Sequence, residues 1–296
     1  MNAQTEAPKT LDGGFQDKSL DPSVNTVRKV GDIEIIAFCD GILPSRVDVV
    51  KGIELAETER LTGVKQGEIM WMSVNEYVVK IGDKIGIIDT GGADRMYPSL
   101  GLLIDNLKKG GIDPAKIDYV FLTHLHPDHM YGLVAKDGTP NFPNAEVILH
   151  ENEANFWIDA KPTGRENVDK NQLQVARHIK DYRDRLRIVK DGEVMPGMSI
   201  ACAPGHTPGH SAWIVHSGKD SAMMWGDCIH LPVIQMMHPE VTTIYDLDGA
   251  LGAQSRRRML DMCVADGIKA LGAHLEFPGY ASVVKKGNGF GFEYDF

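Results

Sequence analysis

One stretch of the sequence, THLHPDHMYGL, places three histidines and an aspartate within six consecutive positions. Side chains two apart in an extended segment point to the same side, so His124 and His126 face one way. Pro127 blocks a regular helix and lets the chain turn, which brings Asp128 and His129 to a neighbouring position. Imidazole and carboxylate groups suit zinc, iron, manganese or cobalt, so this stretch predicts a metal site.

Three later stretches each end an apolar run with a residue that can bind metal. PGHTPGHS carries His206, MWGDCIH carries Asp227 and GAHLEFPG carries His274. In α/β proteins, site residues commonly lie where buried strands end. Each of these residues alone would be interpreted as a turn or capping residue. Together with the first cluster, they predict one shared site.

Segments with strand and helix patterns alternate along the chain, which predicts an α/β fold. The expected strands cover residues 33–39, 73–81, 84–89, 119–123, 145–150, 199–203, 211–216, 222–225 and 270–273. The expected helices cover residues 97–109, 151–159, 170–185 and 247–266. We expect one domain over residues 26–296, a flexible polar arm at residues 1–25, and a loop or flap at residues 159–171.

The composition argues against several classes of protein. The chain has 296 residues and a net charge of −10, whereas a protein that grips nucleic acid normally shows a basic face. The basic cluster at residues 256–258 is expected to be a solvated helix face. Four scattered cysteines form no metal or disulfide pattern. No signal peptide or apolar run of membrane-spanning length is visible, so we expect a cytoplasmic protein without a membrane segment.

The order H-x-H-x-D-H, G-H-T-P-G-H, G-D and a late histidine, with IIDTGG before them, resembles the metallo-β-lactamase-fold hydrolase superfamily. The resemblance implies a four-layer αβ/βα sandwich with two metal ions at one edge. His124, His126 and His206 would hold the first ion. Asp128, His129 and His274 would hold the second ion, and Asp227 would bridge both.

The resemblance also assigns the residues around these ligands. Asp89 of IIDTGG would orient a ligand or a loop of the metal site. His210 is interpreted as a residue that stabilises its loop rather than as a ligand. The two divalent ions are expected to be zinc, with iron, manganese and cobalt as alternatives. A bridging hydroxide would attack the substrate, Asp227 would hold both ions, and Asp128 would also relay a proton to the leaving group.

Within the superfamily, FPNA, ENEANFW, HPEVTT and AHLEFPG resemble the methyl parathion hydrolase-like branch, which includes lactonases. This resemblance implies that Phe156 and Trp157 line an aromatic pocket. Tyr131 stands where smaller residues are common, so it would narrow the pocket or bind a substrate oxygen. His230 would reach the mouth of the site.

These observations predict a hydrolase of lactones or esters, with acyl-homoserine lactones as one substrate class and organophosphate triesters as a further possibility. A glyoxalase II-like thioesterase and a metal-binding sensor with little turnover remain as alternatives. The expected partners are a small-molecule substrate and a second copy of the chain in a homodimer, with no nucleic acid and no membrane.

Overall fold

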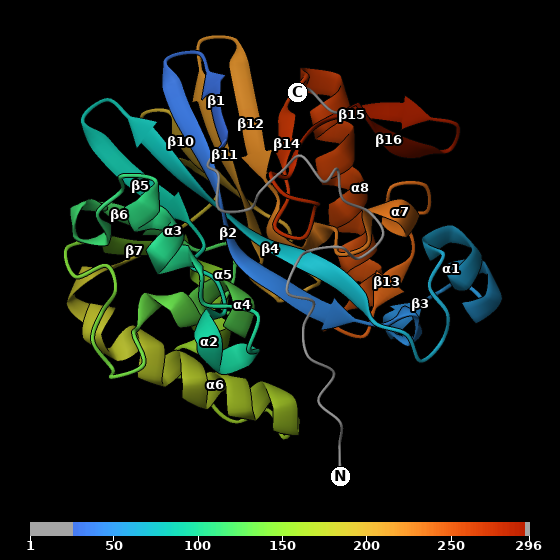
Figure 1. Ribbon diagram of the computed structural model, residues 1–296, viewed down its shortest axis with the longest axis horizontal. Coiled ribbons are helices and arrows are strands. Elements are labelled where there is room, and N and C mark those ends of the chain that lie inside the picture. The colour runs from blue at the N-terminus through green and yellow to red at the C-terminus, as the bar shows by residue number, and fades with distance from the viewer. Residues whose placement is uncertain (1–25, 294–296) are drawn as a thin grey trace.

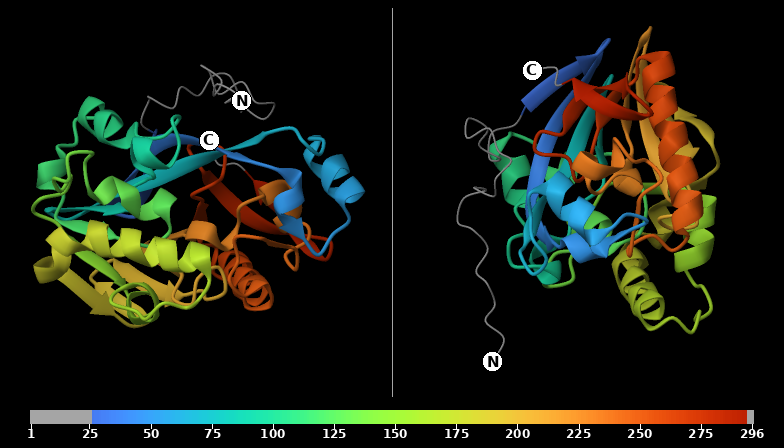
Figure 2. Two further views of the ribbon diagram at one scale, coloured as in Figure 1. Left: turned by 90° about the horizontal axis from the view of Figure 1, so that it is seen from below. Right: turned by 90° about the vertical axis from the view of Figure 1, so that its right-hand side faces the viewer.

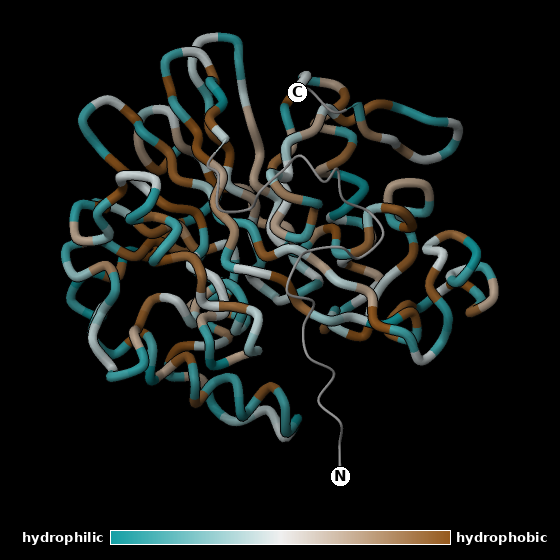
Figure 3. The backbone as a smooth tube through the Cα atoms, in the orientation of Figure 1, coloured by the Kyte–Doolittle hydropathy of each residue, from teal (hydrophilic) through white to brown (hydrophobic). Residues whose placement is uncertain are grey.

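Two seven-stranded β-sheets lie face to face at the centre of the protein, with helices on their outer faces (Figures 1 and 2). This computed structural model describes residues 26–293. The arm predicted at residues 1–25 therefore lies outside the described residues. The hydrophobic segments gather along the central strands, whereas the peripheral loops are mostly hydrophilic (Figure 3).

The first sheet combines antiparallel and parallel strands. Its order is β1-β2-β4-β5-β6-β7-β8, with the bounds β1 (Thr26–Val30), β2 (Ile33–Ser45), β4 (Met70–Ile81), β5 (Lys84–Ile88), β6 (Tyr119–Phe121), β7 (Glu146–His150) and β8 (Leu186–Val189). The strands β5, β6, β7 and β8 are parallel to one another. The carboxyl ends of these strands therefore meet at one edge of the sheet, where the first ligand stretch follows β6.

The second sheet is antiparallel except for the pairing of β12 with β14. Its order is β16-β15-β14-β12-β11-β10-β9, with the bounds β16 (Gly289–Glu293), β15 (Tyr280–Lys286), β14 (Lys269–Leu271), β12 (Asp220–Met224), β11 (Ser211–Ser217), β10 (Met198–Cys202) and β9 (Gly192–Met195). A small additional sheet pairs β3 (Val50–Lys51) with β13 (Thr242–Thr243).

The helices occupy the outer faces and the connections. The α-helices are α1 (Leu55–Thr62), α2 (Ala93–Met96), α3 (Leu103–Lys109), α4 (Pro127–Met130), α5 (Glu151–Trp157), α6 (Glu166–Ile179), α7 (Pro232–Gln235) and α8 (Gly249–Asp266). Short 3-10 turns are η1 (Val47–Val49), η2 (Pro114–Lys116), η3 (Tyr131–Leu133), η4 (Lys180–Arg185) and η5 (Gly226–Cys228). Within residues 26–293, no helix combines the length and apolarity that crossing a membrane requires.

Alternating side chains on the strands build three hydrophobic layers. On β4, Tyr77 and Val79 point into the core between the two sheets, whereas Val78 points outward against α3, α5 and α6. A third core lies between the second sheet and α8. Strand side chains alternate between the two faces of a sheet, and here both faces carry apolar side chains. Each sheet is therefore covered on both sides. The predicted four-layer αβ/βα sandwich is confirmed.

The helix expected at residues 97–109 is shorter than predicted. The helix α3 begins only at Leu103, and the chain before it forms a turn at Gly101, whose φ is +93°. The buried carboxylate of Asp40 accepts hydrogen bonds from the N–H groups of Gly101 and Leu103. This long-range contact fixes the turn, and local helix periodicity could not have indicated it.

The segment expected to be a flap, residues 159–171, is only partly a loop. Its second half forms the first turns of α6, which begins at Glu166 rather than at the predicted residue 170. Asp169 accepts hydrogen bonds from the N–H groups of Thr163 and Gly164, and these bonds hold the preceding loop against the helix start. This segment forms one wall of the cavity described below.

Candidate metal centre

The first ligand stretch begins just after β6. His126 is still extended, with φ −77° and ψ 159°, and Pro127 occupies the first position of α4. Proline suits this position because the N–H that it lacks would have no partner within the helix. Pro127 therefore starts a short helix here rather than only preventing one, and this single turn carries Asp128 and His129 beside the two preceding histidines.

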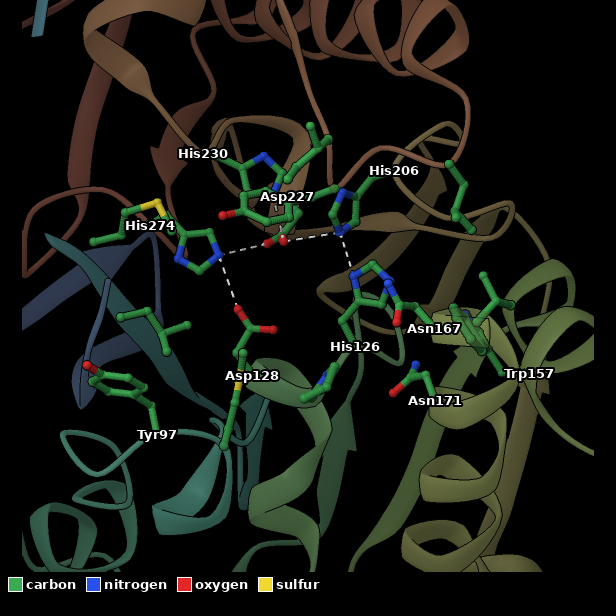
Figure 4. Close-up of a pocket in the computed structure, with 18 of the residues that line it drawn as sticks. Tyr97, His126, Asp128, Trp157, Asn167, Asn171, His206, Asp227, His230 and His274 are labelled. Carbon is green, nitrogen blue, oxygen red and sulfur yellow. Dashed lines mark hydrogen bonds and ion pairs between the residues drawn. The ribbon is translucent and has the colours of Figure 1, made fainter. Parts of the chain in front are cut away.

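Four side chains converge to form the first ligand group, defined as His124, His126, His206 and Asp227. The Nε2 atom of His206 lies 2.8 Å from Nδ1 of His126 and 3.2 Å from Nε2 of His124. The same atom lies 3.2 Å from Oδ2 of Asp227. Figure 4 shows His206 and His126 facing each other beside Asp227.

Asp227 also belongs to the second ligand group, defined as Asp128, His129, Asp227 and His274. Its Oδ1 atom lies 2.9 Å from Nε2 of His129 and 3.2 Å from Nε2 of His274. Asp128 Oδ2 lies 3.5 Å from the same nitrogen of His274 (Figure 4). Asp227 thus offers one carboxylate oxygen to each group, and the structure brings all seven predicted ligands together.

The chemistry and spacing of these atoms fit two divalent ions. Metal–ligand bonds of about 2.0–2.2 Å in tetrahedral geometry separate neighbouring ligand atoms by roughly 3.3 Å. The separations given above lie close to that value. His129 Nε2 and Asp227 Oδ1 are buried and have no hydrogen-bond partner among the described residues, although they face each other. Buried polar atoms without a hydrogen-bond partner are available to coordinate a metal ion.

Burial and neighbouring charges favour the metal-binding protonation states at several of the ligands. At His129, His206 and His274, the effect of burial is outweighed by Asp227 and nearby carboxylates, which raise the pKa. Burial lowers the pKa of His126 to about 3 and holds the pKa of His124 well below its usual range. Burial opposes ionisation of Asp227, but the surrounding imidazoles, led by His129, hold its pKa well below 3.8. Neutral imidazoles and ionised carboxylates are the forms that coordinate metals.

Asp89 supports a ligand of each group from outside. Its Oδ2 atom lies 2.8 Å from Nδ1 of His129 and accepts a hydrogen bond from the Thr123 hydroxyl at 2.7 Å. The hydroxyl of Thr123 in turn lies 3.0 Å from Nδ1 of His124. Such outer partners fix the orientation and tautomer of metal-binding imidazoles. The structure thus places Asp89 where the expected orienting role requires it.

Asp246 provides a similar contact in the second half of the molecule, and the sequence analysis misses it. Its Oδ1 atom lies 3.2 Å from Nδ1 of His206, and its side chain is 1% exposed. Burial opposes ionisation of Asp246, yet the hydrogen bond from His206 and its charge lower the pKa to about 2. Asp246 belongs to a loop without a recognisable motif, so its sequence gives no signal of this contact.

The expectation of a solvated basic face is wrong for Arg256. Its guanidinium donates to the carbonyls of Cys228, Pro239 and Val241 at 2.6–2.8 Å. It also lies 3.9 Å from Oδ2 of Asp246. One face of α8 packs against the second sheet, and Arg256 lies on that face. Its hydrogen bonds hold the loops beside Asp227 and Asp246.

Two further histidines position Asp227 from its other sides. His210 Nδ1 donates to the carbonyl of Ala203, and its Nε2 atom accepts a hydrogen bond from the N–H of Asp227 at 2.9 Å. His210 therefore stabilises its loop, as expected, and also fixes the backbone of the bridging aspartate. His230 Nε2 lies 2.9 Å from Oδ2 of Asp227.

Five of the ligands lie at the floor of a cavity of about 720 Å³: His126, Asp128, His206, Asp227 and His274. Most of its apolar residues, which we call the apolar wall, are Leu43, Pro44, Met72, Met96, Tyr97, Ile244 and Leu247. The residues from α6 and the loop before it, which we call the helical wall, are Arg165, Glu166, Asn167, Val168 and Asn171. Trp157 and His230 also line the cavity, as predicted (Figure 4). This volume is in the range of pockets for small organic ligands.

The structure does not bring Tyr131 and Phe156 into the lining of this cavity. The Tyr131 ring stacks on His178 of α6 at 4.6 Å, with the guanidinium of Arg95 5.9 Å from its centroid. Phe156 packs against the outer core of the first sheet. Successive helix side chains diverge by about 100°, so Trp157 facing the cavity directs Phe156 elsewhere.

A model of the metallo-beta-lactamase superfamily matches residues 69–267. The N-acyl homoserine lactonase AttM of Azorhizobium caulinodans is 29% identical over 126 residues, covering 41% of this chain and 44% of the relative. Atrochrysone carboxyl ACP thioesterase of Passalora fulva is 29% identical over 184 residues, covering 60% of this chain and 46% of the relative. The chain spans about half the length of these curated relatives.

Similarity to solved structures extends over most of the chain. The structure of the hydrolase AbOPH, in the beta lactamase superfamily, has a TM-score of 0.85 and 29% identity, covering 90% of this chain and 96% of that chain. The dizinc quorum-quenching lactonase AidC, in complex with a product, has a TM-score of 0.83 and 25% identity, covering 92% of this chain and 97% of that chain.

Proposed function

The chain belongs to the metallo-beta-lactamase superfamily, and on this premise we propose that it is a dinuclear-metal-dependent hydrolase of lactones or esters. One observation carries the proposal: two ligand groups share Asp227 at the floor of a cavity with an apolar wall. The seven ligands come from the ends of several strands and have few roles other than binding ions in such an arrangement.

In this proposal, the first ligand group holds one divalent ion and the second holds the other. Bound ions of this kind supply an activated water as nucleophile and polarise the oxygen of the substrate. The side chains of the protein position the ions and the substrate. Asp89 and Asp246 orient the imidazoles, and His210 and His230 hold the bridging carboxylate of Asp227 in place.

Asp128 is the residue that we propose for proton transfer to the leaving group. Its side chain lines the cavity and is 12% exposed, so a substrate in the cavity can reach it. Burial opposes its ionisation, but the neighbouring His129 lowers the pKa of Asp128 below its usual range. Asp128 therefore starts the reaction ionised, ready to accept a proton and pass it to the departing oxygen.

The cavity favours a substrate with a compact polar head and an apolar tail. The tail would lie along the apolar wall, while the scissile carbonyl would lie over the ligand groups. Acyl-homoserine lactones have this form, and AttM and AidC are named as lactonases. Organophosphate triesters are a second proposed substrate class, because the same ligand groups could polarise a phosphoryl oxygen.

A thioesterase is the second candidate function. The relative from Passalora fulva is named as a thioesterase, and its match covers more of this chain than the match to AttM does. A thioester presents a carbonyl to the same nucleophile, so the ligand groups alone do not discriminate between an ester and a thioester. The two candidates differ in which substrate gives the higher kcat/KM.

A substrate panel tests the proposal directly. It comprises γ- and δ-lactones, acyl-homoserine lactones, aryl esters, methyl parathion, nitrocefin and acyl thioesters. We expect the highest kcat/KM on a lactone or ester and about two ions per chain by elemental analysis. Removal of the ions with a chelator should abolish turnover. A preference for a thioester or nitrocefin, or full activity of metal-free protein, would contradict the proposal.

Two finer expectations and a test of the sensor alternative accompany this proposal. Zinc is proposed as the ion and a homodimer as the assembly, to be checked by elemental analysis and light scattering of the purified protein. A sensor role is separated from catalysis by Asp227→Asn. If the chain is an enzyme, loss of hydrolysis in this variant also removes its biological effect, whereas a sensor retains the effect.

A further inference from the structure

The helix α5 carries a buried carboxylate that the proposed chemistry does not use. Glu153 is 0% exposed, although it lies only two residues after Glu151, which is partly exposed. A fully buried carboxylate is rare unless hydrogen bonds compensate it. The contacts of Glu153 therefore show which parts of the structure require it.

Both oxygens of Glu153 bind loops that carry metal ligands. Its Oε1 atom accepts a hydrogen bond from the N–H of Leu125 at 2.8 Å. Its Oε2 atom accepts hydrogen bonds from the hydroxyl of Thr207 at 2.6 Å and from the N–H of Gly209 at 3.2 Å. Leu125 lies between His124 and His126, and Thr207 directly follows His206.

The close approach of Gly209 to α5 is independent evidence that this contact is built into the fold. A Cβ atom at position 209 would lie 1.9 Å from the backbone nitrogen of Glu153. Any other residue at this position would push the loop away from the helix. The second glycine of PGHTPGH is thus required for the loop to reach the carboxylate.

We propose that Glu153 is a positioning residue that ties the two loops of the first ligand group together and thereby sets the affinity of that group for its ion. The inference rests on the proposed dinuclear function. Glu153 contacts the loops of three first-group ligands, but no described hydrogen bond joins it to a residue found only in the second group. Its effect should therefore fall mainly on one ion of the two.

The test uses His274→Ala to disable the second ligand group, so that the remaining ion reports on the first. In this background, Glu153→Ala is compared with Glu151→Gln. Glu151 lies on the same helix and forms a surface ion pair with Lys190 at 3.7 Å. The measurement is competitive titration of chelator-treated protein with Zn²⁺. We expect a roughly 10- to 100-fold loss of affinity in Glu153→Ala, and less than about threefold in Glu151→Gln.

A second readout needs no metal ion. In chelator-treated protein, the backbone N–H groups of Leu125 and Gly209 should exchange with solvent at least about tenfold faster in Glu153→Ala than in Glu151→Gln. Should Glu153→Ala fail to fold, Glu153→Gln replaces it. Glutamine keeps one acceptor oxygen for one of the two loops but presents an amide N–H group to the other loop. Faster hydrogen exchange should therefore appear at one of the two N–H groups, that of Leu125 or that of Gly209.

The outcomes separate this inference from the proposed function. Wild-type protein that does not bind two ions contradicts the proposed function. Wild-type protein that binds two ions, while Glu153→Ala matches Glu151→Gln in affinity and in exchange, overturns only the role of Glu153. Equal weakening of both ions by Glu153→Ala in the otherwise wild-type chain also overturns it, because the effect would then be general.

Discussion

The two sheets supply the metal centre in different ways. After β6, the first half places four ligand side chains on one short segment, shaped by an extended strand end and the single turn of α4. The second half supplies three ligands from separate places, after β10, β12 and β14 respectively. The course of one segment brings the first set together, whereas the fold of the second sheet must bring together the second set.

The supporting contacts follow this difference. Within the first half, Asp89 and Thr123 suffice to orient a histidine of each ligand group. The second half needs Asp246 for His206 and the carbonyl of Ser73 on β4 for His274. Both aspartates lie 40 residues from the histidine that they contact, but the second set also depends on the opposite sheet, through Ser73. Among the outer partners of the ligands, substitutions in the second half should be the more selective ones.

Asp227→Asn should have the largest effect, because this residue of the second half serves both ligand groups. The substitution removes one negative charge that two ions share. We expect kcat/KM to fall by more than the roughly 100-fold typical of outer-partner substitutions, with loss of both ions. Kinetics on the best substrate and elemental analysis check this. A variant that retains two ions and a tenth of the activity would contradict the claim that both ligand groups depend on Asp227.

Glu153 joins the two halves, and its effect should depend on pH. Burial, only partly offset by hydrogen bonds from Thr207 and Leu125, raises the pKa of Glu153 from 4.5 to about 7. Because the folded-state pKa is the higher one, stability from this group is full below pH 4.5 and is lost as pH rises through 7. The contribution is at most about 3 kcal/mol.

The measurement is urea unfolding of chelator-treated wild type and Glu153→Gln between pH 4.5 and pH 8. The free energy of unfolding of wild type should fall relative to that of the variant across this range, since glutamine does not titrate. Parallel curves would show that Glu153 does not titrate in this window. Parallel curves would also contradict the proposal that the contact of Glu153 with both halves depends on pH.

Asp89→Asn and Asp246→Asn should have intermediate effects of different selectivity. Each loss of an outer carboxylate is expected to lower metal affinity by about 10- to 100-fold. Asp89→Asn should weaken both ions, because Asp89 supports His129 directly and His124 through Thr123. Asp246→Asn should weaken one ion, since it contacts His206 alone among the ligands. Stepwise Zn²⁺ titration distinguishes the two patterns, and equal patterns would contradict the proposed asymmetry.

The smallest effect should come from the apolar wall, to which both halves contribute. Leu43 lies on β2 of the first sheet and Leu247 precedes α8. Leu43→Ser and Leu247→Ser should each raise KM for a long-chain lactone by about tenfold. KM for a short-chain lactone should change little. Leu102→Ser, at an exposed leucine outside the cavity, is the matched control. An equal change with the control would show that the wall does not bind the chain.

The sequence predicts the ligands better than their surroundings, for a physical reason. Metal binding restricts side-chain chemistry, so histidines and aspartates at strand ends remain recognisable. Asp246 and Arg256 act through contacts between distant segments, and nothing in their local sequence indicates this. The packing of Tyr131 depends on such a contact too: its position beside the motif is visible in the sequence, but its stacking on His178 of α6 is not.

The fold shows a similar division. Buried strands such as β4 and β11 were predicted within a few residues because their apolar runs are determined by burial. The short helix α1 and the edge strands β1, β9 and β16 were missed, because half-exposed segments have a weak hydrophobic pattern. The start of α3 was misplaced because Asp40, distant in sequence, determines it.

The shared carboxylate of Asp227 also makes the two sites thermodynamically linked. An ion held by either group would use the carboxylate of Asp227, and so would restrict the orientation that this side chain offers to the other group. Whatever factor the first ion applies to the affinity of the second, the second must apply equally to the first. The order of loading would be set by the separate affinities of the two groups, while Asp227 and Asp89, which serve both groups, would contribute to the strength of their coupling.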